Sequence, residues 1–168
     1  MIWIVLLIII GASYSIGAIS GAPWVPMRKT DLARVVTILN SHNLKNKSFI
    51  ELGSGDGRLL EAAAAIGWQA TGYEISLLPL TLSFWRRIFS KQEFTVKVKN
   101  FWTADLQGAG AIFAFLMPGT LPRFKEKLEK ELASQTLVIS YVWPISGWKP
   151  LLVDAPAGQA KIFVYERP

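Results

Sequence analysis

Three glycines at alternate positions join a short apolar segment to an alanine-rich one. The stretch FIELGSGDGRLLEAAAA covers residues 49–65 and places Gly53, Gly55 and Gly57 in a G-x-G-x-G pattern. Glycine has no Cβ, so a turn built from it lets the backbone approach a bound molecule closely. The stretch therefore predicts a ligand-binding turn where a strand ends and a helix begins.

The acidic residues around this turn indicate a cationic ligand. A dinucleotide fingerprint is G-x-G-x-x-G, whereas here the third glycine comes one residue early, Glu51 precedes the turn and Asp56 interrupts it. Carboxylates would repel a pyrophosphate but attract an ammonium or a sulfonium group. Glu74 ends the next predicted strand, where a carboxylate can accept hydrogen bonds from both hydroxyls of a ribose. S-adenosylmethionine combines these groups and is the predicted cofactor.

Several other chemistries are excluded or disfavoured. The chain has no cysteine and one histidine, which excludes disulfides and thiol catalysis and predicts no metal site. It has no G-x-S-x-G motif, and no Lys-Ser/Thr pair follows the glycines, so hydrolase and P-loop functions are excluded. The formal charge of +6 lies entirely after Met27 and suits an anionic membrane surface or an acidic partner.

The hydrophobic periodicity predicts alternating strands and helices around the glycine turn. Strands are expected over residues 48–52, 69–75, 93–99, 111–117, 136–142, 150–154 and 160–166, and helices from an N-cap at Thr30 or Asp31 through Leu39 and over 57–66, 76–89 and 120–132. Five residues separate the last two strands, too few for a crossover, so these strands must pair antiparallel. The predicted fold class is α/β, with a Rossmann-like, mostly parallel sheet that ends in an antiparallel hairpin.

The helix over 76–89 contains a basic and aromatic stretch. Its apolar positions are Leu77, Leu80, Phe84 and Ile88, and FWRRIFSK occupies residues 84–91. This stretch could bind nucleic acid or lipid headgroups, but the favoured interpretation is a helix with one solvated basic face.

The N-terminal segment predicts a membrane anchor. Residues 1–27 carry no charge, and residues 2–20 would be roughly 28 Å long as a helix, close to the thickness of a bilayer core. A cleaved signal peptide and a buried core helix are the alternatives. Arg28, Lys29 and Arg34 follow the segment, which favours a single-pass protein with its globular part on the cytoplasmic side. The expected division is an anchor over 1–21, a proline-rich connector over 22–29 and a catalytic domain over 30–168.

Several motifs together resemble one family of methyltransferases. ELGSGDGR followed by GYEI resembles the first two motifs of class I S-adenosylmethionine-dependent methyltransferases. With APWVP, FWTADL and YVWPISGW, the chain is similar to membrane-associated protein-lysine methyltransferases of the mitochondrial ATP synthase c-subunit and adenine nucleotide translocase type, and to their prokaryotic relatives. The resemblance implies a cofactor-binding set of Glu51, Leu52, Gly53, Ser54, Gly55, Asp56, Gly57, Glu74, Ile75, Asp105 and Leu106. Within it, Asp105 would face the adenine amino group and Leu106 would line the ring.

The substrate side of the site is less well defined. Candidates for the mouth that receives a lysine are Trp102, Pro118, Tyr141, Trp143 and Trp148, with ordinary core packing as the alternative for each aromatic residue. The family's Asn-Pro after the acidic ribose ligand is replaced by Ser76 and Leu77, and the residues after Pro118 also differ. No Asn/Asp-Pro-Pro-aromatic motif is present, which disfavours nucleic acid as substrate. The expected function is methyl transfer to a lysine of a membrane protein; methylation of a lipid or lipophilic molecule, and non-catalytic nucleotide binding at a membrane, are the alternatives.

Overall fold

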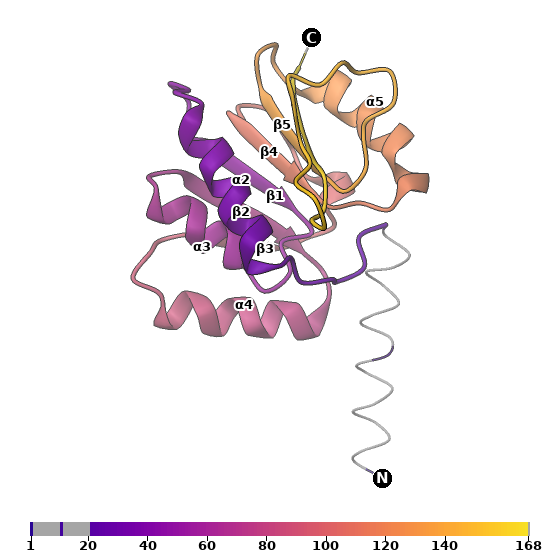
Figure 1. The fold of residues 1–168 in the computed structure, drawn as a ribbon. Coiled ribbons are helices and arrows are strands. Elements are labelled where there is room, and N and C mark those ends of the chain that lie inside the picture. The colour runs from indigo at the N-terminus through magenta and orange to yellow at the C-terminus, as the bar shows by residue number, and fades with distance from the viewer. Residues whose placement is uncertain (2–10, 12–20, 168) are drawn as a thin grey trace.

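The residues described by the structure, a computed structural model, form a sheet of seven strands in the order β3-β2-β1-β4-β5-β7-β6 (Figure 1). The strands are β1 (Ser48–Leu52), β2 (Gln69–Glu74), β3 (Thr95–Val98), β4 (Ala111–Ala114), β5 (Leu137–Tyr141), β6 (Leu152–Asp154) and β7 (Ile162–Glu166). The first five strands are parallel to one another, and β7 lies antiparallel between β5 and β6. The predicted α/β sheet with a C-terminal antiparallel hairpin is confirmed.

The structure describes residues 1, 11 and 21–167. The predicted anchor over 1–21 falls almost wholly on residues outside this set. Among the described residues, no helix is both long enough and apolar enough to cross a membrane.

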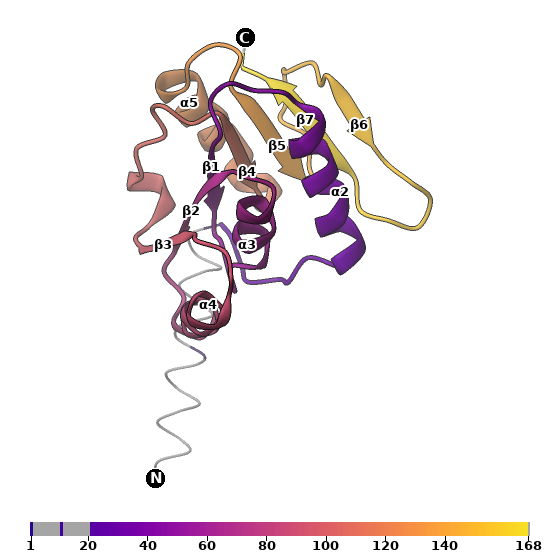
Figure 2. The same cartoon turned by 90° about the vertical axis from the view of Figure 1, so that its left-hand side faces the viewer.

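Helices cover both faces of the sheet (Figures 1 and 2). One face packs against α2 (Lys29–Ser41), α3 (Arg58–Ala65) and α4 (Leu77–Phe89), and the other against α5 (Leu121–Glu131) and the short 3₁₀ helix η1 (Phe101–Thr103). Successive residues of a strand point to opposite faces, so Phe113 joins the first layer whereas Ile112 and Ala114 join the second. Both faces of the central strands are therefore buried, as their apolar sequences predict.

Three local predictions were wrong. Helix α2 begins at Lys29 without a side-chain cap, because the carboxylate of Asp31 is bound by Arg34 and Tyr141. Strand β4 ends at Ala114, and the chain then turns through Pro118–Thr120, a second 3₁₀ helix, η2. In α4, only Leu80 of the four expected inward positions is buried; the other three are exposed, at Leu77, Phe84 and Ile88.

Arg34 fastens the C-terminal hairpin to α2. Its guanidinium donates to the carboxylate of Asp31 at 2.9 Å, to the carboxylate of Asp154 at 2.8 Å and to the carbonyl oxygen of Ala160 at 2.9 Å. Asp31 is fully buried and also accepts a 2.7 Å hydrogen bond from the hydroxyl of Tyr141. Burial and this bond to Asp31 raise the pKa of Tyr141. The network links the first helix of the domain to its last strands.

Removing Arg34 should therefore destabilise the whole domain. Arg34→Met leaves a buried carboxylate with only a tyrosine hydroxyl as partner, so we expect the free energy of unfolding to fall by about 3 kcal/mol. Chemical denaturation measures this value, with Arg87→Met, a change at an exposed arginine of α4, as the control. Equal losses in the two variants would contradict the proposed role of the network.

Candidate functional site

The glycine turn between β1 and α3 adopts a backbone that side chains disfavour. Gly53, Gly55 and Gly57 have φ angles of +75°, +55° and +75°. In this left-handed region a residue with a Cβ is strained by roughly 1–2 kcal/mol. The G-x-G-x-G spacing thus matches the three positions at which the turn needs glycine.

Glu74 holds the turn against the end of β2. Its Oε2 accepts a 2.9 Å hydrogen bond from the Gly55 amide, and its Oε1 accepts 2.8 Å bonds from the amides of Ile75 and Ser76. The carbonyl oxygen of Tyr73 also accepts from the turn. The carboxylate has room for about one further hydrogen bond, since its two oxygens offer about four acceptor sites.

Gly72 of β2 allows the turn to pack this closely. A Cβ at Gly72 would lie 2.4 Å from the Cβ of Ser54 and 2.5 Å from the side chain of Leu60. Gly72 is absent from the residues expected at the site, although a glycine inside a strand is a recognised sign of close backbone approach.

Glu51 is a buried carboxyl group whose Oε2 has no hydrogen-bond partner among the described residues. Burial raises its pKa well above the ordinary value, and the neighbouring carboxylates of Asp56 and Glu74 raise it further. Leaving such a group unsatisfied costs free energy unless a ligand donates to it. The side chain is therefore suited to receive an ammonium group.

Asp56, unlike Glu51, has charged partners within the protein. Arg58 binds both of its carboxylate oxygens, and a nitrogen of Arg86 lies 3.5 Å from Oδ2. Hydrogen bonding to Asp56 raises the pKa of the Arg58 guanidinium. The charge of Asp56 is thus paired with arginines of the protein. Of the two acidic residues expected to attract a cationic ligand at the turn, Glu51 is the one without such a partner.

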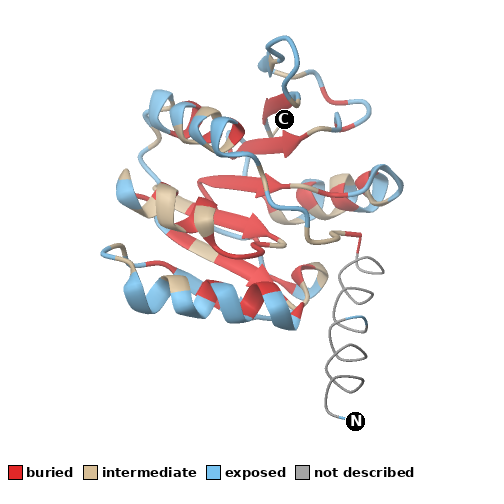
Figure 3. Cartoon of the chain, turned by 60° about the horizontal axis from the view of Figure 1, so that its bottom comes forward, coloured by how far each residue is buried: buried red, intermediate tan, exposed pale blue. Residues whose placement is uncertain are grey.

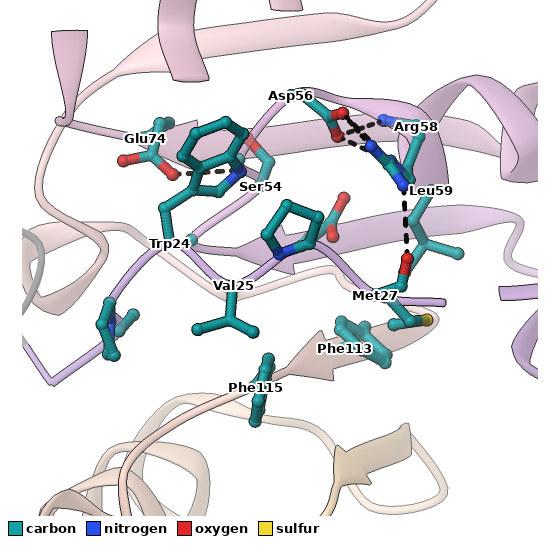
Figure 4. Close-up of a pocket in the computed structure, with 16 residues that line it drawn as sticks. Trp24, Val25, Met27, Ser54, Asp56, Arg58, Leu59, Glu74, Phe113 and Phe115 are labelled. Carbon is teal, nitrogen blue, oxygen red and sulfur yellow. Dashed lines mark hydrogen bonds and ion pairs between the residues drawn. The ribbon is translucent and has the colours of Figure 1, made fainter. Parts of the chain in front are cut away.

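The connector forms a roof over the turn (Figure 4). A Cβ at Gly55 would lie 3.0 Å from the indole of Trp24, and one at Gly53 would lie 3.2 Å from Ala22. Arg58 fastens the connector by donating to the carbonyl oxygen of Met27 at 3.2 Å. Beneath the roof is a cavity of about 50 Å³, which Phe113 and Phe115 also line.

The polar groups at this cavity fit the amino-acid and ribose parts of S-adenosylmethionine. Glu51 offers an unsatisfied acceptor, Glu74 offers a remaining one, and the glycines leave the backbone open. The volume is small because Trp24 lies over Gly55. Binding of a nucleoside-sized molecule therefore requires the segment around Trp24 to move outward.

The structure brings together part of the predicted cofactor-binding set. Six of its members line the cavity: Glu51, Gly53, Ser54, Gly55, Asp56 and Glu74. The side chain of Leu52 packs in the core on the opposite face of the sheet, and Ile75 contributes its amide to Glu74. Asp105 is exposed and accepts from the amide of Gln107, while Leu106 is fully buried in the core near α5. Neither lines the cavity, and their roles toward an adenine stay predictions.

The candidate mouth residues divide into two groups. Pro118 and Trp143 line a groove of about 650 Å³ together with Lys125 and Glu126 of α5. The other three make contacts within the protein, and their role at a substrate mouth stays a prediction. Tyr141 packs edge-to-face against Phe115 and donates its hydroxyl proton to Asp31. Trp148 donates to Glu129, and the guanidinium of Arg123 covers the ring of Trp102 at 4.2 Å.

Trp24, Phe113 and Phe115 are the principal site residues that sequence reasoning missed. The sequence places the two phenylalanines in an apolar strand and Trp24 in a connector, and neither pattern by itself indicates a binding site. The signal that could have found Trp24 is an aromatic residue between two prolines, Pro23 and Pro26, which fix the path of a short segment.

Comparison with known proteins places this geometry in context. The family model for the ANTKMT methyltransferase domain matches residues 51–152. The ATP synthase c-subunit lysine N-methyltransferase of Xenopus laevis is 30% identical over 130 residues, which cover 76% of this chain and 56% of that protein. The adenine nucleotide translocase lysine N-methyltransferase of Mus musculus is 30% identical over 148 residues, covering 86% of this chain and 62% of that protein. The chain thus spans somewhat more than half the length of these relatives.

A prokaryotic relative and a solved structure are also similar. A protein-lysine N-methyltransferase of Saccharolobus islandicus is 29% identical over 133 residues, covering 76% of this chain and 81% of that protein. The RNA methyltransferase of Salinibacter ruber, solved with S-adenosyl-L-homocysteine, superposes with a TM-score of 0.74 at 21% identity and covers 86% of this chain and 94% of that one. At this identity the structural likeness supports the fold.

A methyl group at Gly55 should block ligand binding more than it destabilises the protein. Gly55→Ala introduces left-handed strain and a Cβ that faces the site, whereas Gly67→Ala introduces similar strain at a φ of +86° with no neighbour within 4 Å. We expect both to lower the melting temperature, and only Gly55→Ala to weaken binding of S-adenosylhomocysteine, by at least about tenfold. Calorimetric titration measures the affinity, and equal affinities in the two variants would refute this assignment of the site.

Glu51→Gln should stabilise the free protein and weaken the binding of a cation. The folded state holds the Glu51 proton more tightly than the unfolded chain does, so ionisable Glu51 lowers stability as the pH rises above its ordinary pKa of 4.5. The variant should match the parent at pH 4 and have the higher free energy of unfolding at pH 8. S-adenosylhomocysteine should bind at least about tenfold more weakly to it, because a charge-assisted hydrogen bond is lost.

Glu126→Gln, at an exposed carboxylate of α5, is the control for this prediction. Denaturation at the two pH values and calorimetric titration provide the measurements. A stability difference for Glu51→Gln that does not change between pH 4 and pH 8 would contradict the raised pKa.

Proposed function

Because the chain belongs to the family of ANTKMT methyltransferase domains, we propose that it transfers methyl groups from S-adenosylmethionine to a lysine amine of a membrane protein. The observation that supports this most directly is the unsatisfied carboxyl oxygen of Glu51 beside the glycine turn. A buried acid at this position favours an ammonium ligand and opposes a pyrophosphate. The alternative of non-catalytic binding of a dinucleotide such as NAD is therefore disfavoured.

The residues of the turn hold the cofactor in this proposal. When bound, S-adenosylmethionine would supply the methyl group of its sulfonium. The lone pair of a neutral amine would form a bond to the methyl carbon in line as the carbon–sulfur bond breaks, which would leave S-adenosylhomocysteine and a methylated ammonium that releases a proton to water. Glu51 binds the ammonium of its amino-acid part, Gly53 and Gly55 leave space for its chain, and Glu74 accepts from the ribose. Trp24 moves outward from its position over Gly55 to admit the cofactor. Alignment and exclusion of water supply most of the acceleration in such a displacement.

The acceptor lysine must lose its charge before it reacts. With a reference pKa of about 10.4, a lysine is neutral only about once in 2,500 at pH 7, which is a handicap of roughly 4.6 kcal/mol. An apolar environment lowers the pKa of an amine and removes part of this handicap. The aromatic rings at the cavity, Phe113 and Phe115, provide such an environment, so a dedicated general base is not required.

The relatives support a membrane protein as the substrate. Their names refer to the c-subunit of ATP synthase and to the adenine nucleotide translocase. For this chain we infer a substrate embedded in the same membrane as its own N-terminal anchor, which residues 1–21 provide. The basic residues that follow, Arg28, Lys29 and Arg34, favour a catalytic domain on the cytoplasmic side.

A second candidate function is methylation of a lipid or lipophilic small molecule. Exposed apolar side chains at the carboxyl edge of the sheet favour it: Val25, Met117 and Trp143 are each more than 40% exposed. The same edge would serve a membrane-embedded protein, and the chemical nature of the labelled product separates the two functions.

Membranes from a strain that lacks the protein provide the test. Full-length protein and methyl-labelled S-adenosylmethionine are added, and we expect label in a small membrane polypeptide, at a lysine identified by mass. Gly55→Arg should reduce incorporation at least a hundredfold, because a long side chain fills the cofactor site. Label that extracts into organic solvent would move the assignment to a lipid methyltransferase. Binding of S-adenosylhomocysteine without any incorporation would contradict an enzymatic role.

A further inference from the structure

The outer side of α4 is apolar. Six side chains on it are 40–76% exposed, and we call them the α4 face: Leu78, Leu82, Phe84, Trp85, Ile88 and Phe89. Leu78, Leu82, Trp85 and Phe89 recur at steps of four, three and four residues, and Phe84 and Ile88 form a neighbouring row on the same side of the helix. Two of the rings, those of Trp85 and Phe89, stack in solvent with centroids 5.7 Å apart and planes 6° apart.

The side of α4 that faces the sheet is only partly apolar, since Leu80 is its one large buried hydrophobic side chain. Its inward residues include Ser83, which is fully buried, and Arg86, whose guanidinium donates to the carbonyl oxygen of Asp56 and to the carboxylate of Glu61. Figure 3 shows buried positions on the side of α4 toward the sheet and exposed positions on the outer side. The sequence-based interpretation of one solvated basic face holds for Arg87 and Lys91, which are exposed, but most of the outer side is apolar. A contiguous exposed apolar patch of this kind marks an interaction site.

The charges around the α4 face suit an anionic lipid surface. The segment 76–92 contains no acidic residue, and its exposed basic side chains are Arg87 and Lys91, because Arg86 is bound to Asp56 and Glu61. Lys99, which directly follows β3, the strand beside α4, is also exposed. Aromatic and leucine side chains on a helix flanked by basic residues are typical of helices that lie in the interface of a bilayer.

The position of α4 also places it near a membrane. The helix begins three residues after Glu74, at the edge of the sheet where the connector packs and where the Gly21 carbonyl accepts from the Met117 amide at 2.8 Å. In Figures 1 and 2, α4 forms the lower margin of the domain, and no other labelled element covers its outer side. The connector packs on the domain and therefore does not act as a long spacer between the domain and residues 1–20. A bilayer that holds residues 1–20 would thus lie close to this edge.

We propose that the α4 face is a membrane-contact surface, which inserts its side chains into the interface of an anionic bilayer and turns the carboxyl edge of the sheet toward the membrane. The argument that a bilayer lies near the α4 face depends on the N-terminal anchor of the proposed function. The argument from the apolar and basic residues of the face does not depend on it. The proposal does not depend on methyl transfer, and binding of S-adenosylhomocysteine in the same samples separates failure of one from failure of the other.

The absence of cysteine from the chain makes a direct test possible. Full-length Ile88→Cys, labelled with a polarity-sensitive fluorophore, is reconstituted into vesicles of phosphatidylcholine and phosphatidylglycerol that contain brominated lipid. We expect bromine to quench the probe at least about fivefold more strongly than a probe at Lys130→Cys, an exposed position of α5. Quenching should weaken in vesicles of phosphatidylcholine alone, and equal quenching there would contradict the anionic preference.

Two other occupants of the α4 face give different results. Shielding of the Ile88→Cys probe that depends on protein concentration in detergent, together with a doubled mass, would assign the face to a second copy of the chain. A cross-link between the Ile88→Cys thiol and residues 1–20 within one chain would assign it to the chain's own N-terminal segment. Either result, or a probe at residue 88 that stays exposed to water in vesicles, would overturn the proposal.

A paired substitution tests the aromatic side chains themselves. Trp85→Glu with Phe89→Glu, in the Ile88→Cys background, should reduce quenching by lipid at least about fivefold, because charged side chains do not enter the interface readily. The matched control is Leu152→Glu with Val153→Glu, an exposed apolar pair on β6. Both pairs should bind S-adenosylhomocysteine like the parent, which shows that they fold. Unchanged quenching in the α4 pair would contradict the proposal.

Discussion

The hydrogen bond between the Gly55 amide and the carboxylate of Glu74 is the interaction on which the site depends. It joins the turn that follows β1 to the end of β2, so two parallel strands present one continuous binding edge. Three glycines with positive φ make the turn possible, and Gly72 lets it lie close to the neighbouring strand. The same packing buries Glu51 and leaves one of its oxygens without a partner among the described residues. Ionised Glu51 is therefore unfavourable in the free protein, and a cationic ligand that binds it would offset this unfavourable free energy.

The sequence predicted the fold well where local pattern and tertiary packing agree. The apolar strands β1, β4 and β5 and the five-residue link before the last strand predicted the sheet and its antiparallel end. Prediction failed where long-range contacts decide. Asp31 was expected to cap a helix, but its carboxylate accepts hydrogen bonds from Arg34 and Tyr141 instead. Tyr141 lies more than a hundred residues later in the chain. In α4, periodicity identified the helix but not which side faces the sheet, because both sides carry apolar residues.

The site was predicted in the same uneven way. The acidic and glycine residues of the turn lie close together in sequence, so their spacing revealed five residues of the cavity lining: Glu51, Gly53, Ser54, Gly55 and Asp56. The roof formed by Trp24 could not be predicted from spacing, because it comes from a segment about thirty residues earlier. Tyr141 and Trp148 lie near strand ends as expected, yet hydrogen bonds to Asp31 and Glu129 turn them into the protein. Position along a strand does not determine what a polar aromatic side chain binds.

A crystal structure of the protein with S-adenosylhomocysteine tests the central claim most directly. The account predicts that the amino group of the ligand lies within about 3.2 Å of the Glu51 carboxylate, a hydrogen-bonding distance, and that Trp24 has moved from its place over Gly55. A ligand bound elsewhere, with Trp24 still over the glycine turn and Glu51 still without a partner, would contradict it.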